Sequence, residues 1–291
     1  MTSPRPSLPA LVTGVCGLLA LVLLATPPRR PLRGPHQEPL LPREEVLRVV
    51  GRGYLQLVAD YFWIQLVQTT GAARDANDYL DIAPYAELIT DLDPRFEMVY
   101  SFAGGSLPVN LGRETWVNTE QSTRLLRKGL KLFPNDLRIL MLLAYNLSSF
   151  HHQYREAAEL LERASKLPDA PAFLPQLATR LYAQSGGVEA GLALASSLAE
   201  SSPDEATREM FRKRVQQLEL EGELQRVDHS SQRFSAVFGV PPPDVATLLW
   251  LGYLERPPQD PEGGRVHIGD DGRAYSDSEQ RRLEIFTPTN R

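Results

Sequence analysis

The chain has 291 residues, of which 42% are hydrophobic and 23% are charged. These values are typical of a folded protein with one or two domains, and they exclude a wholly disordered chain. The net charge of -5 argues against a nucleic-acid binder, because a polyanion is repelled unless the protein carries a basic patch. The single cysteine, Cys16, excludes an intrachain disulfide and any zinc or iron–sulfur site built from cysteines.

The first apolar segment lies near the N-terminus. No charged residue occurs between Pro6 and Pro28, and Leu11 to Ala25 reads LVTGVCGLLALVLLA. This run reaches the lower length limit for a helix that spans a bilayer. No A-x-A pattern of a cleavage site precedes the prolines, which argues against a signal peptide. We therefore expect residues 1–27 to form an uncleaved transmembrane anchor that spans the membrane with residues 8–26; a cleaved signal peptide is the alternative.

The residues after this segment bear on orientation. Arg29, Arg30 and Arg33 follow the apolar run, and the positive-inside rule would keep the following domain in the cytoplasm. A short N-terminal tail before a long globular domain is, however, the usual layout of an exported, anchored protein. We expect export and keep the cytoplasmic side as the alternative. Residues 28–43 are rich in proline and predict a semi-rigid linker.

From Glu44 onward, apolar residues recur at steps of three and four, the period of amphipathic helices. The pattern predicts one long helix from Glu44, and no strand pattern occurs before Phe238. Further helices are predicted for 85–92, 96–107, 116–132, 137–150, 154–167, 173–184, 188–200 and 204–238. Proline corners separate successive pairs at Pro94, Pro134, Pro168 and Pro203, with steps of 40, 34 and 35 residues. Such spacing indicates an internal repeat.

The repeat is visible in the sequence itself. Residues 125–136, LLRKGLKLFPND, align with residues 160–171, LLERASKLPDAP. Tyr154, Ala157, Leu161 and Ala164 follow the second-helix pattern of a tetratricopeptide repeat, with small residues where helices cross closely. The chain resembles that family over about residues 53–203, although the first-helix Trp, Gly and Tyr landmarks are mostly missing and the segment Pro108 to Arg113 reads as an insertion. An irregular all-helical domain is the alternative.

This resemblance implies an all-α fold, a tetratricopeptide-like helical-hairpin solenoid. Residues 44–203 would form the repeats, and residues 204–238 would form a long capping helix, since terminal repeats need a polar cap. The expected small partners on first helices are Ala144 and Ala178.

The sequence changes character after Phe238. Asp244 is a good N-cap for a short helix over 245–251, and residues 265–268 and 273–276 predict a hairpin around Gly269 to Gly272. This order, with its proline- and glycine-rich connections, resembles the C-terminal part of type II secretion pseudopilins. We expect a module of residues 239–276, followed by a tail of residues 277–291. Its apolar residues should dock on the end of the preceding helix, at Phe234, Val237 and Phe238.

Candidate chemistry is sparse. His151 and His152 are adjacent, lack partners at metal-ligand spacing and predict a solvated turn. Gly269 to Gly272, with Ser276 and Asp277, offers oxygens for calcium but lacks the alternating aspartates of a calcium loop, so a plain hairpin turn is favoured. No Gly-x-Ser-x-Gly motif occurs. We therefore expect no catalytic, cofactor-binding or metal-binding residues, no cofactor, no nucleic acid and no small-molecule substrate.

The remaining expectation is binding. The first helices of stacked hairpins line a concave surface that holds peptides or partner domains. Polar or aromatic residues on these helices are the candidate protein-binding residues, because Tyr and Arg are frequent in binding hot spots. They are Tyr100, Arg138, Met141, Tyr145, Ser149, Arg180 and Tyr182.

Together, these features predict a membrane-anchored, non-enzymatic scaffold of the bacterial inner membrane with a periplasmic soluble domain. The pseudopilin resemblance indicates an assembly or accessory factor of a type IV pilus or secretion machine, with protein partners in that envelope assembly. An accessory subunit of another envelope complex, such as an ABC transporter, is the first alternative. An enzyme that holds its substrate with helical repeats is the second, and the absence of a convergent set of nucleophile, base and metal ligands disfavours it.

Overall fold

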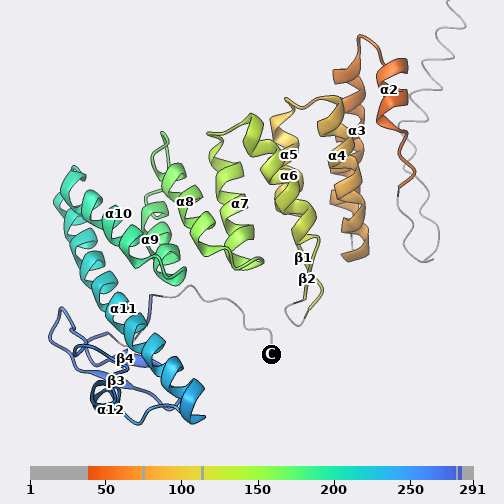
Figure 1. The fold of residues 1–291 in the computed structure, drawn as a ribbon. Coiled ribbons are helices and arrows are strands. Elements are labelled where there is room, and N and C mark those ends of the chain that lie inside the picture. Colours follow the sequence, from red (N-terminus) through yellow and green to blue (C-terminus); the bar gives the residue numbers. More distant parts are fainter. Residues whose placement is uncertain (1–38, 74–75, 113–114, 280, 284–291) are drawn as a thin grey trace, which may run out of the picture. The chain divides into compact units, whose positions relative to one another are not determined.

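The computed structural model describes residues 39–73, 76–112, 115–279 and 281–283. They belong to one compact unit that begins at Pro39. The structure is 65% helical, with 11 α-helices and a few short strands among the described residues. The prediction of an all-α, helical-hairpin fold is confirmed (Figure 1).

The elements follow one another with short connections. In chain order they are α2 (Glu44–Val50), α3 (Leu55–Ala72), the 3-10 helix η1 (Ala76–Asp81), α4 (Ile82–Leu92), α5 (Glu97–Ser106), β1 (Val109–Asn110), β2 (Trp116–Val117), α6 (Thr119–Leu132), α7 (Leu137–Ser149), α8 (Tyr154–Ser165), α9 (Leu174–Gln184), α10 (Val188–Ser201), α11 (Glu205–Phe238), α12 (Val245–Trp250), β3 (Val266–Ile268) and β4 (Ala274–Ser276).

Consecutive helices pack on each other from α3 to α11, so that each helix contacts the one before and the one after it (Figure 1). Apolar residues at helical spacing therefore meet in one continuous core that runs from Ala59 to Tyr182. Leu126, Leu140 and Leu147 lie at its centre and are fully buried.

Two local features differ from the sequence prediction. The long helix expected from Glu44 is interrupted between α2 and α3, where Gly53 has a φ of 92°, a left-handed conformation that ends a helix. The predicted insertion, Pro108 to Arg113, contains the first strand of a hairpin, in which Val109 pairs with Val117 and Asn110 with Trp116. The second strand lies in the segment predicted as the helix 116–132, and that helix begins at Thr119 instead. Two residues per strand are too few to show a period-2 pattern.

Small residues stand where α8 crosses its neighbours. Ala157 and Ala164 are fully buried, as the repeat pattern predicts, and so is Ala178 on α9. Because α8 packs closely on both α7 and α9, no space remains for a longer side chain at these positions.

We therefore expect Ala164→Leu to lower the free energy of unfolding by about 1–3 kcal/mol through overpacking. Urea denaturation followed by circular dichroism measures this change. Ala193→Leu is the matched control, since Ala193 is an exposed helical residue of α10 and should accept leucine without loss. Equal stability of both variants would contradict the packing of α8 described above.

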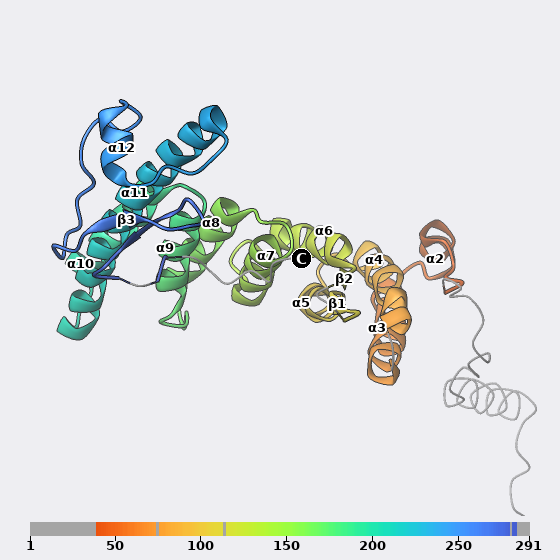
Figure 2. The same ribbon diagram turned by 90° about the horizontal axis from the view of Figure 1, so that it is seen from below.

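The C-terminal module lies along α11 (Figure 2). Asp244 caps α12 by accepting a hydrogen bond from the Thr247 amide at 2.7 Å, and β3 pairs antiparallel with β4 as predicted. The contact with α11 is a second apolar cluster, formed by Leu220, Leu224, Val227, Phe234, Leu248, Leu254 and Ala274.

The position at which this module contacts α11 differs in part from the prediction. It docks on the C-terminal half of α11, from Leu220 to Phe234, so the predicted contact with Phe234 is present, but the cluster does not include the final turn. Val237 is 67% exposed and Trp250 is 85% exposed. Phe238 is half exposed and contacts the Tyr253 ring with centroids 6.4 Å apart. The reason is geometric: Leu248 and Trp250 point about 200° apart on α12, so that only one of them can face α11.

The predicted membrane localisation is corrected by the structure. Within residues 39–73, 76–112, 115–279 and 281–283, no helix is both long enough and apolar enough to cross a bilayer, which contradicts a single-pass inner-membrane protein. The longest helix, α11, carries charges in nearly every turn, and α3 contains Asp60 and three glutamines. The predicted anchor at residues 8–26, the linker up to Glu38 and the expected orientation lie outside the described residues.

Candidate protein-binding surface

The helices of successive pairs differ in charge. α6 and α8 carry five charged residues each, whereas α5, α7 and α9 carry one each, Glu97, Arg138 and Arg180. The charged helices, α6 and α8, are suited to face solvent. The helices with little charge, α5, α7 and α9, are better suited to contact a partner, because charged residues are depleted at the centre of interfaces.

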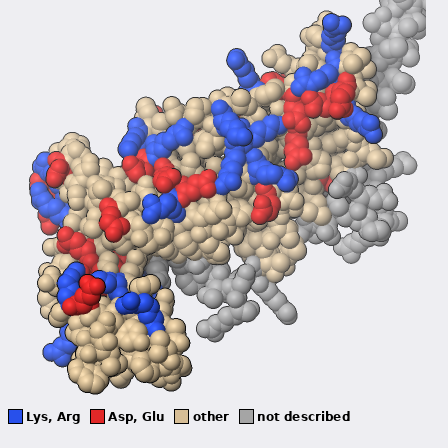
Figure 3. Space-filling model, in the orientation of Figure 1, with Lys and Arg blue, Asp and Glu red and all other residues tan. Residues whose placement is uncertain are grey.

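The charged helices are linked to each other by ion pairs. Arg124 on α6 lies 3.6 Å from Glu87 on α4, and Arg127 on α6 lies 2.8 Å from Glu156 on α8. Lys128 also pairs with Asp91. Figure 3 shows basic and acidic side chains gathered in a band across the molecule, next to a broad area with few charges. The charges in these three pairs therefore already have partners on neighbouring helices.

Four of the predicted binding residues share one face of α7. Arg138, Met141, Tyr145 and Ser149 follow each other at steps of three and four residues, which places them in a single line along the helix. Arg138 and Tyr145 are exposed, and Met141 and Ser149 are half-buried. We call these four residues the α7 stripe.

The α7 stripe ends in three aromatic rings. The Tyr145 ring meets Phe150 edge to face at 5.5 Å, and Phe150 lies 5.0 Å from the Trp116 ring. Tyr145 remains 53% exposed and Trp116 38% exposed. Phe150 follows α7 directly, while Trp116 comes from β2, so the short hairpin brings the third ring to the helix end. We call Trp116, Tyr145 and Phe150 the aromatic cluster.

The other end of the α7 stripe is acidic. Asp136 caps α7 by accepting a hydrogen bond from the Ile139 amide at 2.8 Å. The Asp136 carboxyl group also forms a hydrogen bond with the carboxyl group of Glu97 on α5. This bond, together with burial and repulsion from Asp136, raises the pKa of Glu97, and the nearby Arg138 guanidinium opposes this shift. Arg138 therefore stands beside two carboxyl groups, and its charge is partly balanced.

Two predicted binding residues are buried instead. Tyr100 has no exposed surface, and its hydroxyl donates to the Pro94 carbonyl at 3.0 Å. Burial raises the pKa of Tyr100 to about 12. Tyr182 is 4% exposed and donates to Glu162 at 2.8 Å; burial and this contact raise its pKa as well. Both tyrosines pack between helices, and neither presents a surface to a partner.

The seventh residue, Arg180, is half-buried on α9. Arg180 lies near Arg214 of α11. Burial lowers the pKa of Arg214, and the repulsion between the two guanidinium groups lowers it further. Arg180 is not part of the α7 stripe.

The candidate metal-binding motifs are occupied by internal contacts. His151 is largely buried rather than solvated, because its Nε2 lies 2.8 Å from the Thr123 hydroxyl, beside a buried network in which Asn146 donates to Ser122. In the C-terminal hairpin, Asp271 accepts hydrogen bonds from the Arg273 amide at 3.0 Å and from the Tyr275 hydroxyl at 2.6 Å. Across the described ranges, no group of three or more His, Cys, Asp or Glu is arranged to hold a metal ion.

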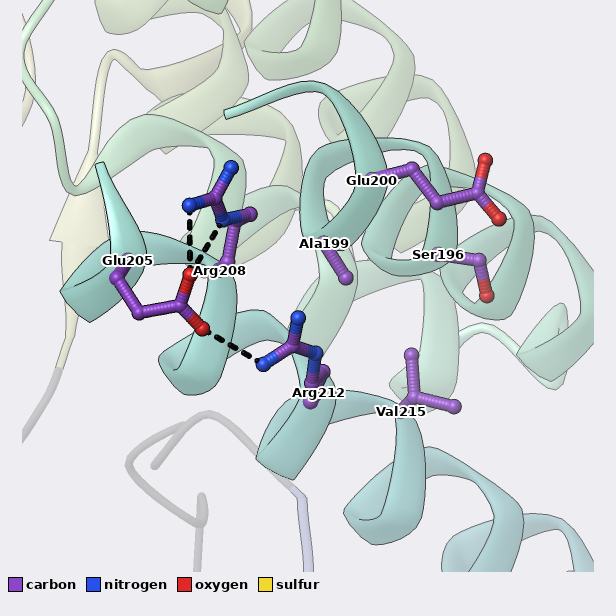
Figure 4. Close-up of a pocket in the computed structure, with 7 residues that line it drawn as sticks. All are labelled: Ser196, Ala199, Glu200, Glu205, Arg208, Arg212 and Val215. Carbon is purple, nitrogen blue, oxygen red and sulfur yellow. Dashed lines mark hydrogen bonds and ion pairs between the residues drawn. The ribbon is translucent and has the colours of Figure 1, made fainter. Parts of the chain in front are cut away.

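A shallow groove lies between α10 and α11. It is lined by Ser196, Ala199, Glu200, Glu205, Arg208, Arg212 and Val215. Figure 4 shows Glu205 between the two arginines, and it accepts hydrogen bonds from Arg212 and Arg208, each at 2.9 Å. These bonds lower the pKa of Glu205. An anionic ligand would therefore have to displace a carboxylate that is already in place.

The sequence prediction missed Trp116 and Phe150. Trp116 lies just after the predicted insertion in the repeat, and Phe150 directly follows Ser149, the last residue of the α7 stripe. An aromatic residue close to an inserted loop was the available signal, since loops on a rigid scaffold often carry function.

No protein-family model and no curated protein matches this sequence. The resemblances to tetratricopeptide repeats and to pseudopilins therefore rest on the residues quoted for them.

Proposed function

We propose that this chain is a non-enzymatic, tetratricopeptide-like scaffold that binds a protein partner through the α7 stripe and the aromatic cluster. The observation that supports this proposal best is the cluster itself, in which three aromatic rings remain partly exposed at one helix end. Aromatic side chains and arginine dominate binding hot spots, because they combine a large contact area with hydrogen bonding.

The geometry favours an extended peptide or a helix as the bound element. The α7 stripe runs over three helical turns from Arg138 to Ser149 with little charge on the same helix, so a partner can lie along it. The exposed Tyr145 hydroxyl and the Arg138 guanidinium supply polar contacts at separate points of this line. Arg138 would prefer an acidic or polar group of the partner.

Selection of peptides from a displayed random library on the full chain tests this proposal. We expect the selected peptides to compete with one another, because they share one surface. Fluorescence anisotropy should show that Tyr145→Ala weakens their binding about 30-fold or more, the effect of a hot-spot residue. Trp116→Ala should act in the same direction.

Trp250→Ala is the matched control. Trp250 is 85% exposed, more than any other aromatic residue on the helices that the structure describes. It belongs to α12 and not to the proposed surface, so its removal should leave the peptide affinity unchanged. Peptides that bind equally well to Tyr145→Ala and Trp116→Ala would contradict the proposed surface.

The biological assembly is a second part of the proposal. The order of short helix, proline-rich loop and hairpin in residues 239–276 supports an accessory role in a type IV pilus or secretion machine, through the resemblance to pseudopilins. Cross-linking in the source cells, followed by mass spectrometry, identifies the partner. A partner set that contains no subunit of such a machine would contradict this part and would leave the binding surface on α7 standing.

A further inference from the structure

A short stretch near the C-terminus is held on α11 in the manner of a bound peptide. After β4, the described residues 277–279 and 281–283 form no helix or strand. The Arg282 side chain and Leu283 are nevertheless buried against α11. Side chains of an irregular segment that fit into sites on another element are the hallmark of peptide recognition.

The site that receives Arg282 lies on one face of α11. Glu221 and Asp228 are two helical turns apart, so both carboxylates project from the same side of the helix. Every nitrogen of the guanidinium has a partner: Nε and Nη2 donate to the two oxygens of Glu221 at 2.9 and 2.7 Å, and Nη1 donates to Asp228 at 2.9 Å and to the Ala274 carbonyl at 3.0 Å. We call Glu221, Asp228 and the Ala274 carbonyl the guanidinium site.

An apolar cluster receives the next side chain. Leu283 belongs to a cluster that includes Val188 of α10 and Phe211 and Leu218 of α11. Its backbone amide donates to Glu221 at 3.3 Å, so the same carboxylate contacts both residues of the segment. A basic and an apolar side chain in sequence therefore meet an acidic and an apolar surface in the same order.

The guanidinium site discriminates strongly among side chains. The attraction within a buried ion pair is largely offset by the lost hydration of its two charges, so the correct ligand gains little net free energy. A wrong ligand leaves buried carboxylates without a balancing charge, and an ammonium lacks the planar fork that serves two carboxylates at once. A site with these properties is suited to recognition, because specificity is a difference between the right and the wrong ligand.

The guanidinium site is also joined to other parts of the molecule. Asp228 accepts a hydrogen bond from the Ala274 amide of β4 at 2.6 Å. Gln225 donates to Glu221 at 3.0 Å and to the Ala183 carbonyl of α9 at 2.8 Å. Occupation of the site is therefore coupled to the position of the C-terminal hairpin and to the end of α9.

We propose that the guanidinium site and the adjoining apolar cluster form a recognition site for an arginine–leucine segment, filled in this structure by the chain's own Arg282 and Leu283 and open to exchange with the same pair of residues in a partner polypeptide. The chain's own segment then acts as an intramolecular competitor. Its tether gives it an effective concentration on the order of millimolar, which a partner has to exceed. The site lies on α11, separate from the α7 stripe, so this proposal does not depend on the proposed function.

Fluorescence anisotropy of the full chain with a labelled synthetic peptide of residues 277–284 tests the proposal. Arg282→Ala vacates the site, so this variant should bind the peptide with a micromolar Kd. Wild type should bind it about 100-fold or more weakly, because its own arginine competes. Arg282→Lys keeps the charge and hence the fold, and its affinity for the peptide should lie between the two.

Substitutions in the peptide provide the controls. Arg282→Ala in the peptide should abolish binding, whereas Arg281→Ala should leave the affinity unchanged, because Arg281 is exposed. A small-molecule probe adds independent evidence. Methylguanidinium at low millimolar concentration should raise the Tm of the Arg282→Ala chain but not that of wild type, and methylammonium should raise neither.

Three results would overturn the proposal. The first is the absence of peptide binding by Arg282→Ala and Arg282→Lys chains whose circular dichroism spectra match that of wild type. The second is binding that the arginine of the peptide does not affect, which would assign the peptide to another surface. The third is a wild-type chain that takes up no peptide at any soluble concentration while Arg282→Ala binds it, which would make Arg282 a permanent structural tie.

Discussion

Replacing Arg282 with alanine should release the C-terminal module from α11 and lower the free energy of unfolding by about 3–5 kcal/mol. The Arg282 side chain is only 8% exposed, and it donates to both oxygens of Glu221, at 2.7 and 2.9 Å, and to Asp228 at 2.9 Å. Glu221 is 3% exposed. Removal of the guanidinium leaves two carboxylates in a buried site with no cation to balance them.

Urea denaturation and limited proteolysis measure this effect. We expect Arg282→Ala to become sensitive to cleavage within residues 255–265, which connect α12 to β3. Arg282→Lys should fall between wild type and alanine, because an ammonium keeps the charge but cannot donate in parallel to Glu221 while also reaching Asp228.

Arg256→Ala is the control for this prediction. Arg256 also pairs with a carboxylate of α11, Glu223, at 2.5 Å, but its side chain is 54% exposed and Glu223 keeps its bond to Arg226. The expected loss is about 0–1 kcal/mol, the range of exposed ion pairs. Equal losses in Arg256→Ala and Arg282→Ala would contradict the special role of the buried site.

The second large effect is expected at Tyr100. Tyr100→Ala should lower the free energy of unfolding by about 3–5 kcal/mol, because it removes a fully buried ring from the crossing of α5 and α6. The crossing is close: a Cβ built on Gly129 of α6 would lie 2.7 Å from the ring carbon Cγ of Tyr100. Tyr100→Phe should cost only about 0.5–1.5 kcal/mol, since it loses one hydrogen bond to Pro94.

Tyr145→Ala provides the matched comparison. Tyr145 is 53% exposed, so its loss should change stability by less than about 0.5 kcal/mol while weakening peptide binding. Thermal denaturation separates the two tyrosines. If Tyr100→Ala were as stable as Tyr145→Ala, the assignment of Tyr100 to the core would be wrong.

These two tyrosines show where sequence reasoning stops. Both lie on first helices of a hairpin, and both were candidates for partner contact on the basis of residue type. Residue type does not state which side of a helix faces the next helix, and Gly129, 29 positions away, creates the space that Tyr100 fills. A contact between residues so far apart in the chain is a property of the tertiary structure.

The candidate surface depends in the same way on distant parts of the chain. The line of Arg138, Met141, Tyr145 and Ser149 was readable from the sequence, since helical period alone aligns them. The cluster was not, because Trp116 reaches Phe150 only through the β1–β2 hairpin. Glu221 and Arg282 form the best-buried ion pair described. Neither residue stood out in the sequence, because 61 positions separate them.

The sequence by itself determined most of the helical elements, the long α11, the buried alanines of α8, the cap at Asp244 and the C-terminal hairpin. Each follows from local rules: helical period, capping chemistry and turn residues act within a few positions. The tertiary structure decided which tyrosines are buried, where the module docks on α11, and that Arg282 is buried against that helix. Those outcomes depend on which helix faces meet, and burial between elements far apart in the chain is a collective result of packing that no local pattern contains.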